Sequence, residues 1–252
     1  MAEREPTQGR LRLSVVLPVY NTGGYLDELY ARLVKTLEGQ QFEFELVMVD
    51  DGSPDGAHVK LEELARKDTR IKALFLSRNF GQHPAISAAL EHASGDLIVL
   101  MDADLQDQPE DIPLLLTRLT PEVDIVYTVK TGAHEGLLTG LTSRLYHQVF
   151  SSITKTDVPP NIGTFRLFRR SVLQSLLQYP ERQVLYGPLM FFIGFRYTSV
   201  PVAHPPRLSG RSGYTFLKRL SLALNSLLSY TDIPHRILIM LGVLILASTL
   251  LY

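Results

Sequence analysis

Along the first 130 residues, short apolar segments alternate with longer segments in which apolar positions recur at helical spacing. The apolar segments are rich in valine, isoleucine, leucine and phenylalanine, and they cover 11–20, 42–51, 71–77, 95–103 and 124–129. The segments with helical spacing cover 25–38, 57–67, 84–93 and 110–119. Strands that alternate with helices of this length predict an α/β fold, in which helices cover both faces of a mostly parallel sheet.

The pattern is different after residue 130. Residues 137–152 predict a further helix, and residues 171–178 predict a short one. Residues 214–230 carry apolar side chains on one helical face, with Lys218 and Arg219 beside it, which is typical of an amphipathic helix. Such a helix lies either on a membrane surface or against the α/β domain, and the pattern alone leaves both placements open.

The last 16 residues, Ile237 to Tyr252, contain no charged side chain. A helix of this length spans about 24 Å, less than the ~30 Å hydrocarbon core of a membrane. A buried core helix has a similar composition, but the basic residues directly upstream favour a membrane segment. We therefore expect an α/β domain over 1–203, a basic amphipathic segment over 204–233 and the truncated beginning of a transmembrane helix over 234–252.

Composition narrows the classes of protein and partner. Hydrophobic residues make up 45% of the 252 residues, which excludes a disordered chain. The absence of cysteine excludes a disulfide scaffold and a thiolate zinc site. The polar N-terminus predicts no secretory signal. The formal net charge of −1 hides an asymmetry, because residues 204–252 carry five basic side chains and one acidic side chain, and this predicts an anionic partner.

Polar residues follow four of the predicted strands at the point where each strand ends. They are Tyr20-Asn21, Asp50-Asp51-Gly52-Ser53, Arg78-Asn79 and Asp102-Ala103-Asp104. In open α/β sheets, ligands bind at the carboxyl ends of the strands. We therefore expect these side chains to surround one crevice.

The sequence Asp102-Ala103-Asp104-Leu105-Gln106 is the strongest chemical signal. Its two carboxylates and its amide oxygen are hard ligands that suit Mg²⁺ or Mn²⁺, especially an ion that also holds a diphosphate. Aspartates are also frequent in ordinary turns. The interpretation therefore depends on the position of the motif between an apolar strand and the start of a helix.

Asp50 and Asp51 have two interpretations. They are typical of a turn that caps the following helix, and they are also suited to accept hydrogen bonds from a nucleobase or a ribose. The chain contains neither of the glycine-rich loops that hold phosphates in dinucleotide-binding domains and in P-loop proteins. We therefore expect a metal ion at Asp102 and Asp104 to neutralise the diphosphate.

Five segments together resemble the family 2 glycosyltransferases: LSVVLPVYN, LVMVDDGSPDG, LSRNFGQHPAISAAL, ASGDLIVLMDADLQDQPEDI and FRLFRRSV. The most similar branch is the group of dolichol-phosphate mannosyltransferases and bacterial undecaprenyl-phosphate glycosyltransferases. The resemblance runs from about Leu13 to Arg236 and implies a GT-A catalytic domain with a Rossmann-like sheet over 1–203, followed by an amphipathic interfacial helix and membrane helices. The chain departs from this group at Thr164, where aspartate is common, and at 210–214, where Gly-Glu-Ser-Lys-Tyr is common.

The resemblance also implies roles for particular residues. The nucleotide would be held by Pro18, Tyr20, Asp50, Asp51 and Asp102. The metal ion, Mg²⁺ or Mn²⁺, would be held by Asp102, Asp104 and Gln106. Catalytic roles would belong to Asp104, Arg144 and Arg166, and contacts with the lipid phosphate to Arg207 and Arg211.

The implied function is metal-dependent transfer of a sugar, with inversion, from a nucleotide-diphosphate sugar to a polyprenyl phosphate such as undecaprenyl phosphate. The reaction would take place on the cytoplasmic face of the inner (plasma) membrane and involve no nucleic acid; assembly of several copies is left open. A phosphate acceptor needs no catalytic base, because its second pKa is about 6 and it is mostly a dianion at neutral pH. Two alternatives remain open: transfer to a glycan hydroxyl, with Asp107 or Asp157 as the base, and a non-catalytic subunit that binds the sugar nucleotide.

Overall fold

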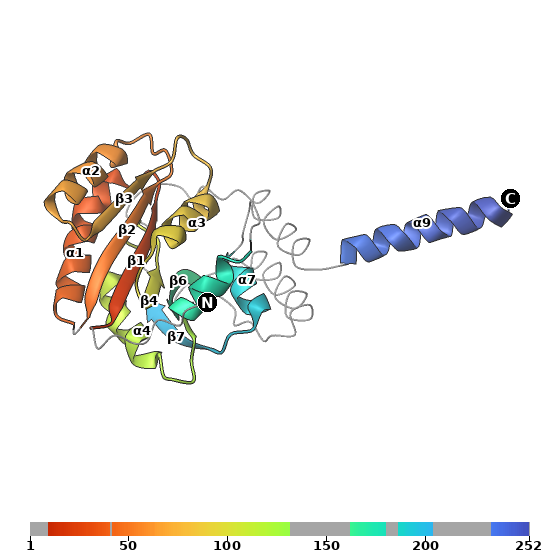
Figure 1. The fold of residues 1–252 in the computed structure, drawn as a ribbon. Helices are drawn as coiled ribbons and strands as arrows, with labels where there is room; N and C mark the ends of the chain where they lie inside the picture. Colours follow the sequence, from red (N-terminus) through yellow and green to blue (C-terminus); the bar gives the residue numbers. More distant parts are fainter. Residues whose placement is uncertain (1–9, 41, 132–161, 180–185, 204–232, 252) are drawn as a thin grey trace, which may run out of the picture. The chain divides into compact units, whose positions relative to one another are not determined.

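The computed structural model describes residues 10–40, 42–131, 162–179, 186–203 and 233–251 (Figure 1). The chain divides into two compact units. One consists of Met1–His134 and Pro159–Ser209, and the other of Glu135–Val158 and Gly210–Tyr252. All of the described strands lie in the first unit, and the described C-terminal helix lies in the second.

In the described part of the chain, one seven-stranded sheet forms the centre of the first unit. Its strands are β1 (Arg12–Val19), β2 (Glu43–Asp50), β3 (Ile71–Phe75), β4 (Leu97–Leu100), β5 (Ile125–Thr131), β6 (Ile162–Arg169) and β7 (Tyr197–Ala203), in the order β3-β2-β1-β4-β6-β5-β7. β1 is parallel to β2 and β4, β2 is parallel to β3, and β5 is parallel to β7. β6 is antiparallel to both β4 and β5. The predicted α/β fold with a mostly parallel sheet is confirmed.

Helices lie between the strands of the first unit. Those of the first unit are α1 (Leu26–Glu38), α2 (Ala57–Lys67), α3 (Gln82–His92), α4 (Ile112–Arg118), α6 (Arg170–Leu176) and α7 (Tyr186–Ile193), with the short 3-10 turns η1 (Gly23–Tyr25) and η2 (Pro109–Asp111). The four helices expected between the first five strands are confirmed to within two residues at each end.

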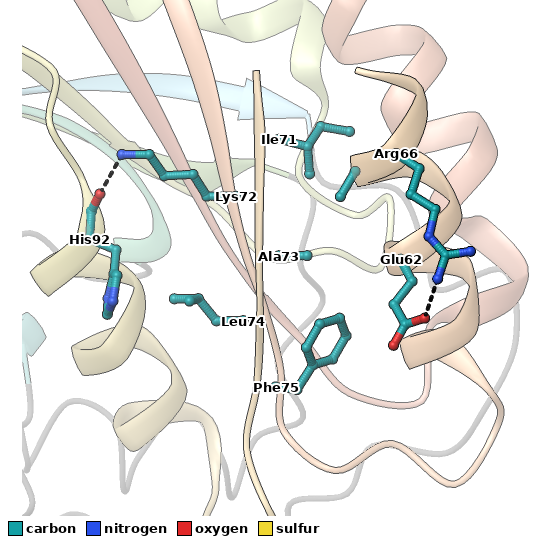
Figure 2. A pocket seen from close by; sticks show the side chains of 9 residues that line it. Glu62, Arg66, Ile71, Lys72, Ala73, Leu74, Phe75 and His92 are labelled. Carbon is teal, nitrogen blue, oxygen red and sulfur yellow. Dashed lines mark hydrogen bonds and ion pairs between the residues drawn. The ribbon is translucent and has the colours of Figure 1, made fainter. Parts of the chain in front are cut away.

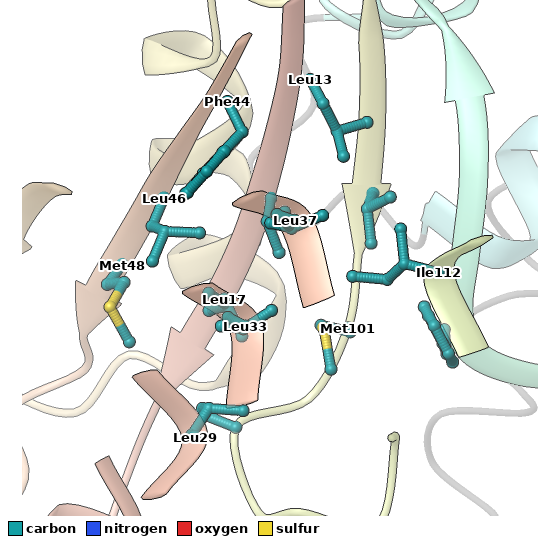
Figure 3. Packing of buried hydrophobic residues seen from close by; sticks show 14 of the residues in the cluster. Leu13, Leu17, Leu29, Leu33, Leu37, Phe44, Leu46, Met48, Met101 and Ile112 are labelled. Carbon is teal, nitrogen blue, oxygen red and sulfur yellow. The ribbon is translucent and has the colours of Figure 1, made fainter. Parts of the chain in front are cut away.

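The core explains why this pattern folds into layers. On α1, buried leucines recur at helical spacing and form one apolar stripe: Leu26, Leu29, Leu33 and Leu37. This stripe belongs to the same apolar cluster as alternate strand residues such as Leu17 of β1 and Met48 of β2 (Figure 3). The intervening strand residues, such as Val16 and Val47, are also fully buried, on the opposite face of the sheet. α3 contacts β1 and β2 there, so helices cover both faces as predicted (Figure 1).

The C-terminal helix α9 (Ile233–Leu251) corrects one expectation. Across the residues that the structure describes, no helix has the length and apolar character needed to cross a membrane. The beginning of a transmembrane helix expected over 234–252 is therefore not found. A proline, a histidine and an arginine occupy the first turn of α9 and lower its apolar character.

Several other expectations concern residues that the structure does not describe. The helices expected over 137–152 and 214–230 lie outside the described ranges, as does nearly all of the basic segment 204–233. The division of the chain into 1–203, 204–233 and 234–252 therefore stays a prediction.

Candidate active site

The segments that follow β1, β2, β3 and β4 lie at one edge of the sheet, because these four strands run in the same direction. β6 runs the opposite way, and its residue Arg166 pairs with Leu100 at the end of β4. The beginning of β6 therefore lies beside the segment that follows β4. This carboxyl edge, formed by the ends of four parallel strands and the beginning of β6, is the candidate active site.

The segment after β2 is held by its own two aspartates. Asp50 and Asp51 are buried, with exposed fractions of 3% and 2%. Asp50 accepts a hydrogen bond from the Ser53 backbone N–H at 3.2 Å, as expected of a turn. Asp51 accepts the backbone N–H groups of Phe80 and Gly81 at 2.7 and 2.8 Å, one on each carboxylate oxygen. Asp51 therefore ties the loop after β2 to the loop after β3, and its contact with a nucleotide stays a prediction.

Gly52 is required for this close approach of the two loops. Its φ is +64°, and a Cβ at this position would lie 2.6 Å from the carbonyl carbon of Arg78. Burial raises the pKa of Asp51, although the Phe80 and Gly81 N–H groups act in the opposite direction. The two loops therefore form one unit around a buried carboxyl group.

The segment after β1 presents an aromatic side chain. Tyr20 is 48% exposed, whereas Pro18 before it is buried within β1. Asn21 has a φ of +55°, and its N–H donates to Ser53 Oγ at 3.1 Å, so the loop after β1 is fixed to the loop after β2. Tyr20 is thus an exposed aromatic residue, and the hydrogen bond from Asn21 to Ser53 holds the backbone next to it in place.

The acidic segment after β4 is supported from both sides. Gln82, in the first turn of α3, donates its Nε2 hydrogen to Asp102 Oδ1 at 2.6 Å. The Asp102 N–H donates to Asp107 Oδ2 at 2.9 Å, which closes the segment on itself. The Gln106 N–H donates to Asp104 Oδ1 at 3.2 Å. These bonds fix the positions of the three residues that were expected to hold the metal ion.

Leu105 lies in the middle of this segment and has a φ of +62°, a left-handed conformation that costs a leucine about 1–3 kcal/mol. Its side chain is 5% exposed and belongs to the core cluster. Burial of this side chain therefore offsets the strain. The half-buried residues Asp104 and Gln106 lie on either side of this anchor.

Asp107 has the most perturbed carboxyl group at this edge. Its side chain is 4% exposed. Burial, followed by the charge of Asp102, raises the pKa of Asp107 to about 7, and the charge of Lys130 opposes this rise. Perturbed carboxyl groups of this kind are concentrated at functional sites.

Arg166 is a buried cation beside the acidic segment. Its guanidinium donates to the carbonyl oxygens of Thr164 at 2.8 Å and Gly163 at 3.0 Å, and it lies over the Tyr127 ring at 5.3 Å. Burial lowers the pKa of Arg166, while Tyr127 and then Asp102 and Asp107 favour its charged form. The structure therefore places Arg166 where its charge opposes that of the acidic segment, and direct contact with a substrate stays a prediction.

Sequence reasoning overlooked three groups around Arg166. Gln82 holds Asp102, as described above. Burial and the neighbouring charge of Arg166 lower the pKa of His83. Tyr127 stacks on Phe191 with ring centroids 4.7 Å apart. Gln82 and His83 lie within LSRNFGQHPAISAAL, one of the segments that resemble the family, and this position could have marked them as site residues. Tyr127 lies in none of those segments, so nothing in the sequence indicated its role.

The remaining predicted site residues cannot be placed against this edge. Arg144, Arg207 and Arg211 lie outside the described residues, as does Asp157. Their roles stay predictions.

Asp102, Asp104 and Gln106 are the oxygen donors expected to hold a divalent ion. Among the described residues, no group of three or more His, Cys, Asp or Glu side chains is placed to hold a metal ion. Mg²⁺, however, is commonly bound by one or two carboxylates together with substrate phosphates, rather than by a protein-only cage. Asp102, Asp104 and Gln106 provide two carboxylates and one amide oxygen, so their chemistry fits an ion shared with a diphosphate.

Proteins of solved structure share this sheet and the arrangement of its helices. The fold is similar to that of glucosyl-3-phosphoglycerate synthase from Mycobacterium tuberculosis, solved with Mn²⁺, UDP and glucosyl-3-phosphoglycerate. The TM-score is 0.62 at 17% identity, over 91% of this chain and 86% of the other. The similarity supports a GT-A-like α/β architecture.

Residues 14–177 match the family model for glycosyl transferase family 2, and the chain belongs to this family. It is 33% identical over 243 residues to an uncharacterized glycosyltransferase from Synechocystis sp., which covers 96% of this chain and 76% of the relative. It is 34% identical over 232 residues to the undecaprenyl-phosphate 4-deoxy-4-formamido-L-arabinose transferase of Proteus mirabilis, which covers 92% of this chain and 71% of the relative. The predicted family and enzyme class are confirmed: the protein is a glycosyltransferase, and the non-catalytic alternative is set aside.

Proposed function

We propose that this enzyme transfers a sugar, with inversion, from a nucleotide-diphosphate donor to a polyprenyl phosphate, and that the transfer depends on Mg²⁺ or Mn²⁺. The observation that carries the proposal is the acidic segment after β4, in which Asp102 is held by Gln82 and by Asp107 beside the buried charge of Arg166. The choice of acceptor is supported by similarity to the Proteus mirabilis undecaprenyl-phosphate transferase.

The donor nucleotide would lie across the ends of β1 and β2. Tyr20 is exposed there and offers an aromatic face to the nucleobase. A carboxylate has about four acceptor sites, so Asp50 retains capacity for a ribose hydroxyl after accepting the Ser53 N–H. Asp51 would contribute indirectly, by holding the loop that contains Phe80 and Gly81.

The diphosphate would lie at the end of β4. Asp102, Asp104 and Gln106 would hold the divalent ion there, and Asp102 would also contact the nucleotide. When bound, such an ion stabilises the negative charge of the departing nucleoside diphosphate. The buried guanidinium of Arg166 would balance the negative charge of Asp102 and Asp107 in the acidic segment.

The acceptor is the group that makes a catalytic base unnecessary. A phosphate monoester has a second pKa of about 6, so its attacking oxygen is already ionised at neutral pH. Attack on the anomeric carbon, opposite the leaving diphosphate, inverts the configuration, and the protein has to position the two reactants. Asp107 and Asp157 were the two candidate bases for a glycan hydroxyl. Asp107 is 4% exposed and accepts the Asp102 N–H, which supports a role in holding the acidic segment, and Asp157 lies outside the described residues.

The place of reaction follows from the acceptor. A polyprenyl phosphate is confined to a membrane, while nucleotide sugars are water-soluble. The catalytic edge would therefore work at the cytoplasmic surface of the membrane, where the basic residues Arg207 and Arg211 would attract the lipid phosphate with about 1 kcal/mol each.

A transfer assay tests this proposal. Membranes that contain the full chain and undecaprenyl phosphate are offered radiolabelled UDP-, GDP- and dTDP-sugars with Mg²⁺ or Mn²⁺. We expect a lipid-extractable product with one donor class, which disappears with EDTA and returns when metal is added in excess. NMR of the product should show inverted anomeric configuration.

Three results would count against parts of the proposal. Product with free glycans but not with the lipid would assign the acceptor to a hydroxyl. Full activity in the presence of EDTA would exclude the proposed dependence on a metal ion. Nucleotide binding without transfer to either acceptor would contradict the proposed reaction.

A further inference from the structure

β3 is the outermost strand of the sheet on the side of β2. Within the described ranges, β2 is the only strand that pairs with it. The Leu46 N–H donates to the Arg70 carbonyl, and the Leu76 N–H donates to the Asp50 carbonyl. In this register the peptide groups of Ala73 and Phe75 face away from β2. Among the described residues, the outer edge of β3 is therefore available for pairing.

A groove of about 530 Å³ runs along this edge (Figure 2). α2 contributes Glu62, Ala65 and Arg66 to its lining, α3 contributes His92, and β3 contributes all five of its residues. Ile71 and Phe75 lie on the α2 side of the strand, and Lys72 and Leu74 lie on the α3 side (Figure 2). Phe75 is 45% exposed, so the α2 side presents a large apolar ring to its surroundings.

The usual protection of an edge strand is weak here. Outer strands commonly avoid pairing through an outward lysine, a proline or a bulge. β3 contains no proline, and its register with β2 is regular. Its lysine, Lys72, is tied inward, because Nζ lies 3.0 Å from the His92 carbonyl oxygen and 3.0 Å from Glu45 Oε2.

We propose that this edge pairs with the same edge of a second copy of the chain, antiparallel, about a two-fold axis at Ala73. In this register the N–H and C=O of Ala73 bond reciprocally with those of the copy. The Phe75 N–H bonds to the copy's Ile71 carbonyl, and the Phe75 ring lies over the strand of the copy on the α2 side. The exposed aromatic ring is thereby covered, whereas Ile71 is already buried, at 6% exposure, within its own molecule.

Charge on α2 supports a second copy as the occupant. Glu62 and Arg66 line the groove one helical turn apart and form an ion pair at 3.3 Å. A two-fold axis at Ala73 sets α2 antiparallel to its copy, so that Glu62 of one molecule faces Arg66 of the other. The same patch is then complementary to itself, as an interface between identical subunits requires.

Cysteine cross-linking tests the register directly, because the chain contains no cysteine. Residues in a hydrogen-bonded antiparallel pair have Cα atoms about 5.5 Å apart, a separation that a short bismaleimide linker spans. We expect Ala73→Cys in the full chain, in mild detergent, to form a linked dimer with this reagent. The control is Leu114→Cys on α4, at 38% exposure, which should stay monomeric under the same treatment.

A second measurement does not depend on the new thiol. Sedimentation velocity of the unmodified chain in the same detergent should show a dimer, and Phe75→Lys should shift it to the monomer while the thermal melt followed by circular dichroism is unchanged. The proposal is overturned if the unmodified chain is monomeric at all concentrations. It is also overturned if Ala73→Cys cross-links no faster than Leu114→Cys, or if Phe75→Lys leaves that cross-link undiminished.

Discussion

Glu45 and Asp107 are both buried carboxyl groups of the same sheet, and they respond to burial in opposite ways. Glu45 is 1% exposed and lies near the edge of the sheet opposite the carboxyl edge, the amino edge, where the parallel strands β1, β2 and β4 begin. Burial by itself raises its pKa, but hydrogen bonds from Ser14, Ser94 and Lys72 outweigh this effect and lower it to about 2. At the carboxyl edge, burial and the charge of Asp102 raise the pKa of Asp107 to about 7.

The difference lies in the neighbours. Glu45 accepts bonds from Ser14 Oγ and the Ser94 N–H at 2.6 Å each, and it lies 2.8 Å from Arg12 and 3.0 Å from Lys72. Asp107 is surrounded by other carboxylates, with Lys130 as an opposing charge. The amino edge is therefore neutralised and serves stability. At the carboxyl edge, neighbouring carboxylates raise the pKa of Asp107, an arrangement in which a bound divalent ion would be stabilised.

The largest effect is expected at the carboxyl edge. Asp104→Asn should reduce sugar transfer by at least about 10²–10³-fold, because the site loses a preorganised charge. The melting temperature of the variant should not fall, since Asp104 is half-buried and does not belong to the apolar core. Asp27→Asn is the matched control, because Asp27 is an exposed aspartate on α1 that pairs with Lys60 at 2.7 Å. Equal activity in the two variants would remove Asp104 from the site.

At the amino edge we expect loss of stability in place of loss of activity. Glu45→Gln should lower the free energy of unfolding by about 2–3 kcal/mol, because charged hydrogen bonds to a buried acceptor are lost. Urea denaturation measures this change. Glu43→Gln, at the exposed start of β2, should change it little. Transfer activity per folded molecule should be the same in both variants, and a selective loss in Glu45→Gln would mean that the two edges are coupled.

The pH dependence of stability should follow the same residue. The folded-state pKa of Glu45 is about 2, below its ordinary value of 4.5, so its contribution is fully present above pH 4.5 and is lost as the pH falls toward 2. Urea midpoints measured from pH 6 to pH 2.5 should therefore converge for the unmodified protein and Glu45→Gln as the pH falls. Parallel curves would show that Glu45 is not the titrating group.

A smaller effect on activity is expected at Gln82. Gln82→Ala removes the 2.6 Å hydrogen bond to Asp102, and loss of such a supporting bond typically costs about 10–100-fold in activity or metal affinity. Mn²⁺ binding, followed by electron paramagnetic resonance with nucleoside diphosphate present, should weaken in parallel. A variant that binds Mn²⁺ normally but transfers slowly would place the role of Gln82 elsewhere.

Much of the fold was predictable because its signals are local. The spacing of Leu26, Leu29, Leu33 and Leu37 is enough to define α1 and its buried face. The short apolar segments are enough to define β1 to β5. The direction of β6 was not predictable in this way, because pairing between distant strands leaves no periodic trace in either one.

The acidic residues of the candidate site were predictable for a similar reason. Asp50, Asp51, Asp102 and Asp104 directly follow strands, and parallel strands end at one edge. The structural role of each aspartate was not predictable. Asp51 looked like a ligand-binding residue, yet both of its oxygens accept backbone N–H groups from the loop after β3.

The sequence by itself determined the α/β class, the family and the edge of the sheet that forms the candidate active site, because periodicity and contiguous motifs are carried by neighbouring residues. Only the tertiary structure decided that Gln82 holds Asp102, that Arg166 lies buried beside it, and that Glu45 and Asp107 have opposite pKa shifts. These properties depend on which distant groups surround a side chain and how completely they exclude water. Folding alone brings those groups together.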